Sequence, residues 1–167
     1  ELSKLAASAL LAARISLMNE VAWVAELAGA DVEQVRRAVG ADHRIGPACL
    51  FAGAGYGGAN LAGDVRTLMA LAAGLGYGFR ALEAAERVNA EQKEWLACRM
   101  QRHFGSLEGR VIAVWGLAFK PGTGDVREAP ALALVERLLA AGARVQVYDP
   151  AASSTAKAAL ASRVKFC

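Results

Sequence analysis

The hydrophobic pattern of this chain changes its period once, at the stretch bounded by Gly105 and Gly109. Upstream, apolar residues recur every three to four positions, which is typical of helices. Downstream, the short apolar run 110–115 ends at Gly116, which is typical of a buried parallel strand. We therefore expect a helical domain over residues 1–104, followed by the beginning of an α/β domain over residues 105–167.

The element pattern predicts an α + α/β fold, in which a helical domain precedes a partial Rossmann-like parallel α/β domain. The apolar face of residues 2–28 is rich in alanine, which lets a second helix approach closely, so we expect the helical domain to be a dimerisation domain that uses this face. Asp31 is a candidate N-cap for the second helix, and Gly29 and Gly40 are candidate helix ends. Because so few strands make a poor open sheet, we expect the α/β domain to be incomplete in these residues. The predicted helices are 2–28, a short one through 35–39, 65–73, 80–103, 130–141 and 152–162; the predicted strands are 110–116 and 144–148; and 41–63 is predicted to be irregular.

Composition narrows the classes of protein. The 167 residues carry a formal net charge of +3 from scattered basic side chains, which argues against a nucleic-acid partner. Charged residues interrupt the alanine-rich opening 2–28, so we expect a buried helix and no membrane span. Three distant cysteines and two lone histidines lack metal-ligand spacing, and we expect a reduced, cytoplasmic protein without a metal. The chain opens on Glu1 rather than on methionine, so we expect a segment of a longer protein.

The densest cluster of glycines lies at 53–58, where Gly-Ala-Gly-Tyr-Gly-Gly matches the letters of the dinucleotide fingerprint. That fingerprint needs a strand before it and a helix at its end. Here Gly46 and Pro47 stand where the strand should be, which argues against a Rossmann turn. Backbone pressed on a flat ligand and a plain surface loop both remain open.

Several blocks of the chain resemble the nucleotide-sugar 6-dehydrogenases, the UDP-glucose dehydrogenase family, in the same order. The motif Arg44-Ile45-Gly46-Pro47 favours the UDP-glucose branch of this family. These blocks are Lys4 to Ser8, Arg14 to Glu20, Gly29 to Val32, Gly40 to Gly46, the glycine loop with Asp64, Val88-Asn89, Gln92-Lys93, Gly116 to Pro121 and Asp125 to Pro130.

The resemblance implies oxidation of a sugar C6 alcohol to a carboxylate with two molecules of NAD, through a thiohemiacetal and a thioester on a cysteine. It implies catalytic roles for Lys4, as the cation that stabilises an oxyanion, and for Asp64, as the carboxylate that handles the proton. It also implies a homodimer about the first helix, with Arg44 reaching the partner's sugar. The remaining implied contacts are Ser8, Phe51, Gly53, Gly55, Tyr56, Gly57, Phe119 and Lys120 for the UDP-sugar, and Asn60 and Arg127 for NAD.

The departures from the family pattern concentrate at the reactive position. Asn60 stands where the family has its nucleophilic cysteine, and Gly63 stands where it has lysine. Ser8 replaces an asparagine, so one oxyanion donor is shorter. Because an amide cannot form a thioester, we expect this chain alone to be inactive as an NAD-dependent oxidoreductase.

Other interpretations of the same residues remain open. Lys4 could be a solvated helix end, and Asp64 could be the N-cap of a helix that begins at Val65. Phe119 and Arg127 have ordinary core and surface interpretations. At the level of the chain, the alternatives to a dehydrogenase segment are a non-catalytic homologue that binds UDP-sugars or dimerises, and a helical interaction domain with an α/β tail.

Overall fold

The computed structural model describes residues 1–167, which form two compact units. Unit 1 comprises 1–55 and 60–92, and unit 2 comprises 56–59 and 93–167. The division falls inside one long helix, α4 (Arg80–Phe104), which contributes to both units. The hydrophobic period predicts a boundary between two functional domains near residue 104, and this boundary stays a prediction.

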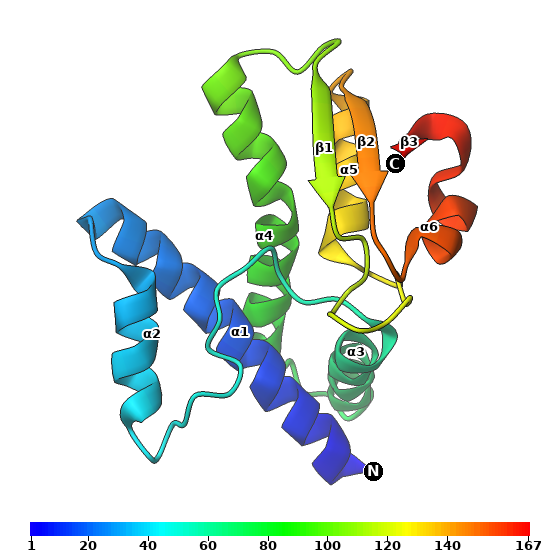
Figure 1. The fold of residues 1–167 in the computed structure, drawn as a ribbon. Helices are drawn as coiled ribbons and strands as arrows, with labels where there is room; N and C mark the ends of the chain where they lie inside the picture. Colours follow the sequence, from blue (N-terminus) through cyan, green and yellow to red (C-terminus); the bar gives the residue numbers. More distant parts are fainter. The chain divides into compact units, whose positions relative to one another are not determined.

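Unit 1 is helical, and no strand precedes residue 105, as expected (Figure 1). Its helices are α1 (Leu2–Ala28), α2 (Val32–Ala41), α3 (Ala59–Gly74) and the first part of α4. Gly29 ends α1 in the left-handed region at φ 70°, and the Asp31 carboxylate accepts the Glu33 N–H as the predicted N-cap of α2. Ser16 of α1 donates to the Ala85 carbonyl of α4 at 2.8 Å, so the predicted packing of these two helices is confirmed.

Two local expectations in unit 1 are wrong. Gly40 lies inside α2, which continues to Ala41. A Cβ on Gly40 would lie 3.2 Å from Pro47 Cα, so this glycine provides room for the returning chain instead of ending the helix. The irregular segment also ends earlier than expected, because α3 begins at Ala59.

The first helix is long and apolar enough to cross a membrane by length and composition, a test that core helices of soluble proteins also pass. Two of its polar side chains donate to other segments of the chain: Arg14 to the Gly46 carbonyl at 2.9 Å, and Ser16 to α4. Asn19 is fully buried and accepts from the Gly53 N–H. Buried polar groups with such partners favour packing against protein.

Unit 2 is built on a parallel sheet in the order β1 (Val111–Trp115), β2 (Arg144–Tyr148), β3 (Lys165–Phe166). Val111 pairs with Arg144 and Trp115 with Tyr148, and Gln146 pairs with Lys165. The connections are α5 (Pro130–Ala140), which lies against one face of the sheet, and α6 (Ser153–Leu160) with a short 3₁₀ turn after it (Figure 1). The expected parallel α/β class is confirmed.

The core of unit 2 lies between the sheet, α5, α6 and the end of α4. Side chains on the other face of the sheet are open, and Trp115 is 85% exposed there. The fully buried side chains of the core include Leu107, Leu117, Val135, Leu138, Val147 and Leu160.

Candidate functional site

The first group of predicted site residues lies on two helices of unit 1. Lys4 and Ser8 are one turn apart on α1, so they share a face, and both point to Asp64 on α3. The Lys4 ammonium lies 2.9 Å from Asp64 Oδ1, and the Ser8 hydroxyl donates to Oδ2 at 2.8 Å. Three residues that the sequence named separately are thus brought together.

The alternative role of Asp64 as an N-cap is wrong, because α3 begins five residues before it. The helix starts directly after Gly58, whose φ of +83° suits glycine, and the small residues from Ala59 onward continue it. Asp64 therefore sits on the second turn, where its carboxylate is free to meet α1 rather than the backbone of its own helix.

The hydrogen bonds from Lys4 and then Ser8 lower the pKa of the Asp64 carboxyl below its ordinary value. A carboxylate that stays ionised is a good acceptor and a poor proton donor at neutral pH. Asp64 is thus suited to hold Lys4, whose own side chain is 66% exposed. Its ammonium is consequently oriented and still accessible to a ligand.

Asn60, at the predicted nucleophile position, is the second residue of α3 and is exposed. A helix start concentrates unpaired N–H groups and favours a negative charge close by. A thiolate would be stabilised in this place, whereas the neutral amide of Asn60 offers no nucleophile.

The glycine-rich loop is fixed to unit 1 through both polar groups of Gly53. Its N–H donates to Asn19 Oδ1 at 2.9 Å, and its carbonyl accepts from Gln92 Nε2 at 2.7 Å. Trp23 Nε1 in turn donates to Gln92 Oε1 at 3.3 Å. The roles of Asn19 and Gln92 were missed from the sequence. For Asn19 the available signal was a lone amide on an apolar helix, whereas Gln92 lies on a helix rich in charged residues and gave no such signal.

Two other predicted residues of unit 1 are engaged elsewhere. Arg44 is exposed and forms an ion pair with Asp42, with Nη2 and Oδ2 2.6 Å apart. Phe51 is 65% exposed, and the Arg36 guanidinium lies 4.2 Å from its ring centroid. These contacts keep an exposed arginine and an exposed aromatic ring in defined positions.

In unit 2 the two glycines at 57 and 58 dock on the segment between β1 and α5. The Gly58 N–H donates to the Arg127 carbonyl at 2.9 Å. A Cβ on Gly57 would lie 2.9 Å from the Glu128 carbonyl carbon, and one on Gly58 would lie 2.6 Å from the Phe119 ring. The close approach requires glycine at both positions.

The same segment carries the remaining predicted residues. The Lys120 ammonium lies 5.3 Å from the Phe119 ring centroid, and Arg127 pairs with Asp125. Hydrogen bonds from Arg127, first from its side chain and then from its backbone N–H, lower the Asp125 pKa to about 2. Tyr56 is buried, and Gly55 has a φ of +95°. Two exposed cations and one aromatic ring are thus held on a loop that the glycines contact.

The carboxyl ends of β1 and β2 are joined by Asp149, which is 7% exposed. Its carboxylate accepts the N–H groups of Leu117, Ala118, Ala151 and Ala152 at 2.7 to 3.1 Å. Burial alone would raise the Asp149 pKa, but these four donors outweigh it and bring the pKa to about 2. A protein carboxylate therefore occupies the backbone donors that an anionic ligand often uses in such folds.

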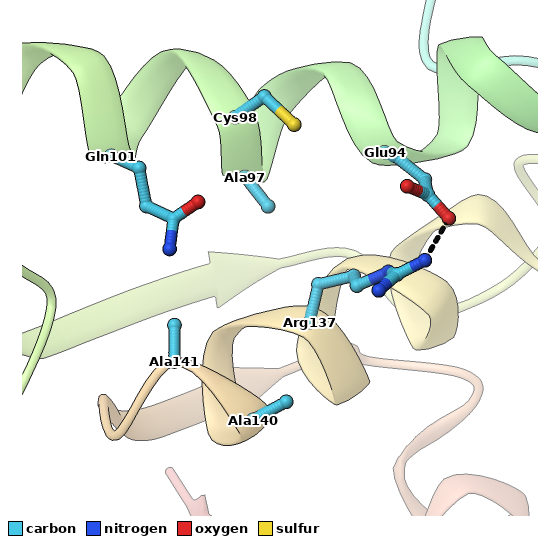
Figure 2. Close-up of a pocket in the computed structure, with 7 residues that line it drawn as sticks. All are labelled: Glu94, Ala97, Cys98, Gln101, Arg137, Ala140 and Ala141. Atoms are coloured by element: carbon cyan, nitrogen blue, oxygen red, sulfur yellow. Dashed lines mark hydrogen bonds and ion pairs between the residues drawn. The ribbon is translucent and has the colours of Figure 1, made fainter.

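A groove of about 200 Å³ lies elsewhere in unit 2, between α4 and α5 (Figure 2). Glu94 and Arg137 form an ion pair across it, and Cys98 and Gln101 line the α4 side. None of the residues predicted for the site lines this groove.

Comparison with known proteins identifies the origin of this arrangement. Residues 1–91 match the central domain of the UDP-glucose/GDP-mannose dehydrogenase family, and residues 113–167 match its UDP binding domain. The chain belongs to the UDP-glucose/GDP-mannose dehydrogenase family. The resemblance expected from the glycine loop and its flanking blocks is therefore confirmed.

Relatives of this dehydrogenase family cover nearly the whole chain. A UDP-glucose 6-dehydrogenase of Pseudomonas aeruginosa is 50% identical over 92% of this chain and 34% of its own length. UDP-glucose 6-dehydrogenase TuaD of Bacillus subtilis is 43% identical over 99% of this chain and 36% of its own. The structure of a UDP-glucose dehydrogenase from Pyrobaculum islandicum superposes with a TM-score of 0.97 at 38% identity, over 99% of this chain and 38% of that one. The chain thus spans about a third of the length of the relatives it matches.

Proposed function

We propose that these residues form the central and UDP-binding part of a dehydrogenase that acts on UDP-glucose, and that this chain by itself binds the nucleotide sugar without oxidising it. The observation that carries the proposal is the held pair of Lys4 and Asp64, with Asn60 four residues before Asp64 on the same helix. The four-residue spacing supports placing Asn60 and Asp64 on one face of α3. Lys4 is the cation for a developing oxyanion in this proposal, and Ser8 and Asp64 keep it in place.

The sugar nucleotide is proposed to bind along the glycine-rich loop. Phe51, Gly53 and Gly55 supply an exposed ring and backbone that is fixed through Asn19 and Gln92. Tyr56, Gly57, Phe119 and Lys120 are the proposed contacts in unit 2, where the loop meets the segment after β1. Arg44 is proposed to reach the sugar bound by a partner subunit.

NAD is the implied cofactor, and the chain offers one contact suited to it. Arg127 presents an exposed guanidinium that fits a diphosphate, while residues 53–58 form a loop without a preceding strand and do not fit a dinucleotide turn. Bound NAD would accept hydride from the sugar alcohol. Within this chain Arg127 would hold a phosphate, and Asn60 would offer a neutral amide that forms no covalent bond to the sugar.

Absence of a thiol at Asn60 also favours a second candidate, a non-catalytic homologue that binds UDP-sugars or dimerises. The exposed side chains of Leu10, Leu17 and Val24, spaced by seven on α1, support a two-fold helix contact in either case. The face differs from the one expected, since the alanines Ala9, Ala12 and Ala25 are buried within the chain itself. A cytoplasmic location and a role in polysaccharide precursor supply belong to the same proposal.

Isothermal titration of the purified chain with UDP-glucose tests the binding part of the proposal. Absorbance at the NADH band, in the presence of UDP-glucose and NAD, tests the absence of oxidation. We expect binding of UDP-glucose, weaker binding by Lys120→Ala, and no NADH. Lys165→Ala is the matched control, because Lys165 is exposed on β3 and outside the site. A chain that binds neither UDP-glucose nor UDP at millimolar concentration would contradict the proposal, and NADH formation would contradict its inactive part.

A further inference from the structure

Two arginines of the candidate site are held by the same local arrangement, an aspartate two residues earlier in the chain. Asp42 Oδ1 accepts the Arg44 backbone N–H at 3.0 Å, and Asp125 Oδ1 accepts the Arg127 backbone N–H at 2.9 Å. In both pairs the carboxylate also accepts from arginine Nε at 3.0 Å and from Nη2 at 2.6 Å. One carboxylate thus binds both the backbone and the side chain of its arginine.

The arrangement fixes the direction of the guanidinium. A guanidinium has five N–H donors in a rigid plane, and the carboxylate takes the edge that carries Nε and one Nη2 hydrogen. The edge that carries Nη1 and the second Nη2 hydrogen makes no bond to this carboxylate, and the Arg127 side chain is 69% exposed. Such an edge matches two oxygens of a phosphate.

Asp125 is itself held more firmly than an ordinary surface carboxylate. Its side chain is 22% exposed, its carbonyl accepts the Phe119 N–H at 3.0 Å, and its own N–H donates to Thr123 Oγ1 at 3.2 Å. Exposed ion pairs contribute little when both side chains are free to move. Here one partner is fixed by the backbone, so the ordering of Arg127 costs little at the moment of binding.

We infer that Asp125 is a positioning residue, whose carboxylate directs the Arg127 guanidinium so that its free edge receives a phosphate of a diphosphate-containing ligand. The inference rests on the proposed function, because it assumes that the segment after β1 meets a nucleotide. Gly58 donates to the Arg127 carbonyl, which connects this arginine to the glycine-rich loop. Lys120 on the same segment adds a second positive charge.

One substitution distinguishes a positioning role from a simple charge effect, because the two predict opposite changes in affinity for the anion. Asp125→Asn removes a negative charge near the bound anion, so Coulomb attraction alone predicts tighter binding. Loss of the preset guanidinium predicts weaker binding, by about threefold to tenfold for one freed arginine side chain. Asparagine still has an oxygen that can accept the Arg127 backbone N–H, so the turn itself is retained.

The experiment follows the Arg127 Nε–Hε signal by NMR during titration of the whole chain with inorganic pyrophosphate. We expect a slowly exchanging Nε–Hε signal in the free wild type, its loss in Asp125→Asn, and weaker pyrophosphate binding in that variant. Asp31→Asn is the matched control, because asparagine also serves as an N-cap at the start of α2 and no site residue is involved. In an Arg127→Lys background the same Asp125→Asn change should strengthen binding, since lysine cannot be held as a fork and only the charge effect remains.

Equal or tighter pyrophosphate binding by Asp125→Asn in the wild-type background would overturn the inference, as would a rapidly exchanging Arg127 Nε–Hε. Competition with UDP-glucose and with NAD distinguishes the two sources of diphosphate: we expect one of them to displace pyrophosphate, and displacement by neither would overturn the inference. Failure of this test with intact UDP-glucose binding removes the role of Asp125 alone. Absence of UDP-glucose binding with an intact Asp125 effect contradicts the proposed function instead.

Discussion

Substitution of Gly57 by alanine is the most direct perturbation of the glycine-rich loop where it contacts the segment after β1. A Cβ at this position would overlap the Glu128 carbonyl group and lie 3.0 Å from Pro130 Cδ. Both neighbours belong to the start of α5 and its N-terminal approach, where Glu128 has a φ of +52° and little freedom to shift. The loop must therefore move away from the segment after β1.

Two contributions give the size of the effect. Forced overpacking against backbone costs about 1–3 kcal/mol, and loss of the hydrogen bond from Gly58 to the Arg127 carbonyl costs about 1 kcal/mol. We expect Gly57→Ala to lower the free energy of unfolding by about 2–4 kcal/mol and to weaken UDP-glucose binding. Urea denaturation measures the first effect, and hydrogen exchange of the Gly58 amide shows whether the loop has lifted.

Two glycines of the same region provide matched controls, because a Cβ on Gly53 or on Gly63 would meet no atom within 4 Å. Gly53→Ala should leave the free energy of unfolding nearly unchanged. Gly63→Ala lies inside α3 and should stabilise the protein by up to about 1 kcal/mol through helix propensity. If Gly57→Ala were as stable as Gly53→Ala and kept its Gly58 amide protected, the steric reasoning would be refuted.

Three further predictions concern other parts of the chain. The folded-state pKa of Asp149 is about 2, below its usual value, so the stability that its carboxylate contributes is present above pH 5 and is lost as the pH falls toward 2. In urea titrations the difference in unfolding free energy between wild type and Asp149→Asn should therefore narrow by about 2 kcal/mol over that range. A constant difference would disprove the assignment. Asn60→Cys should react with iodoacetamide at neutral pH faster than Cys98, because a helix start favours the thiolate; equal rates would remove that argument. Leu17→Arg should give a monomer in sedimentation equilibrium where the wild type is a dimer, whereas Leu75→Arg, at another exposed leucine that lies outside α1, should leave the dimer intact; a monomeric wild type would contradict the dimer proposal.

Local chemistry allowed much of the fold to be predicted. The N-cap at Asp31, the helix end at Gly29 and the apolar run ending at Gly116 each depend on neighbours in the sequence, and the structure contains all three features. The same rules gave a helix end at Gly40 and, as one alternative, an N-cap at Asp64, and both of these are wrong. Gly40 is set by contact with Pro47, and Asp64 is set by two partners on α1, so neither could be deduced from adjacent residues.

By itself the sequence determined the family, the order of the helices and of the first two strands, and the absence of a thiol at Asn60, since these depend on residue identity and on periodicity along the chain. Only the tertiary structure decided how the site residues are held. The pairing of Lys4 and Ser8 with Asp64 joins residues about sixty positions apart, and Gly58 meets Arg127 across a comparable separation. Such contacts depend on packing between elements, which no local pattern encodes, and packing also decides which alanines of α1 are buried and which leucines stay exposed.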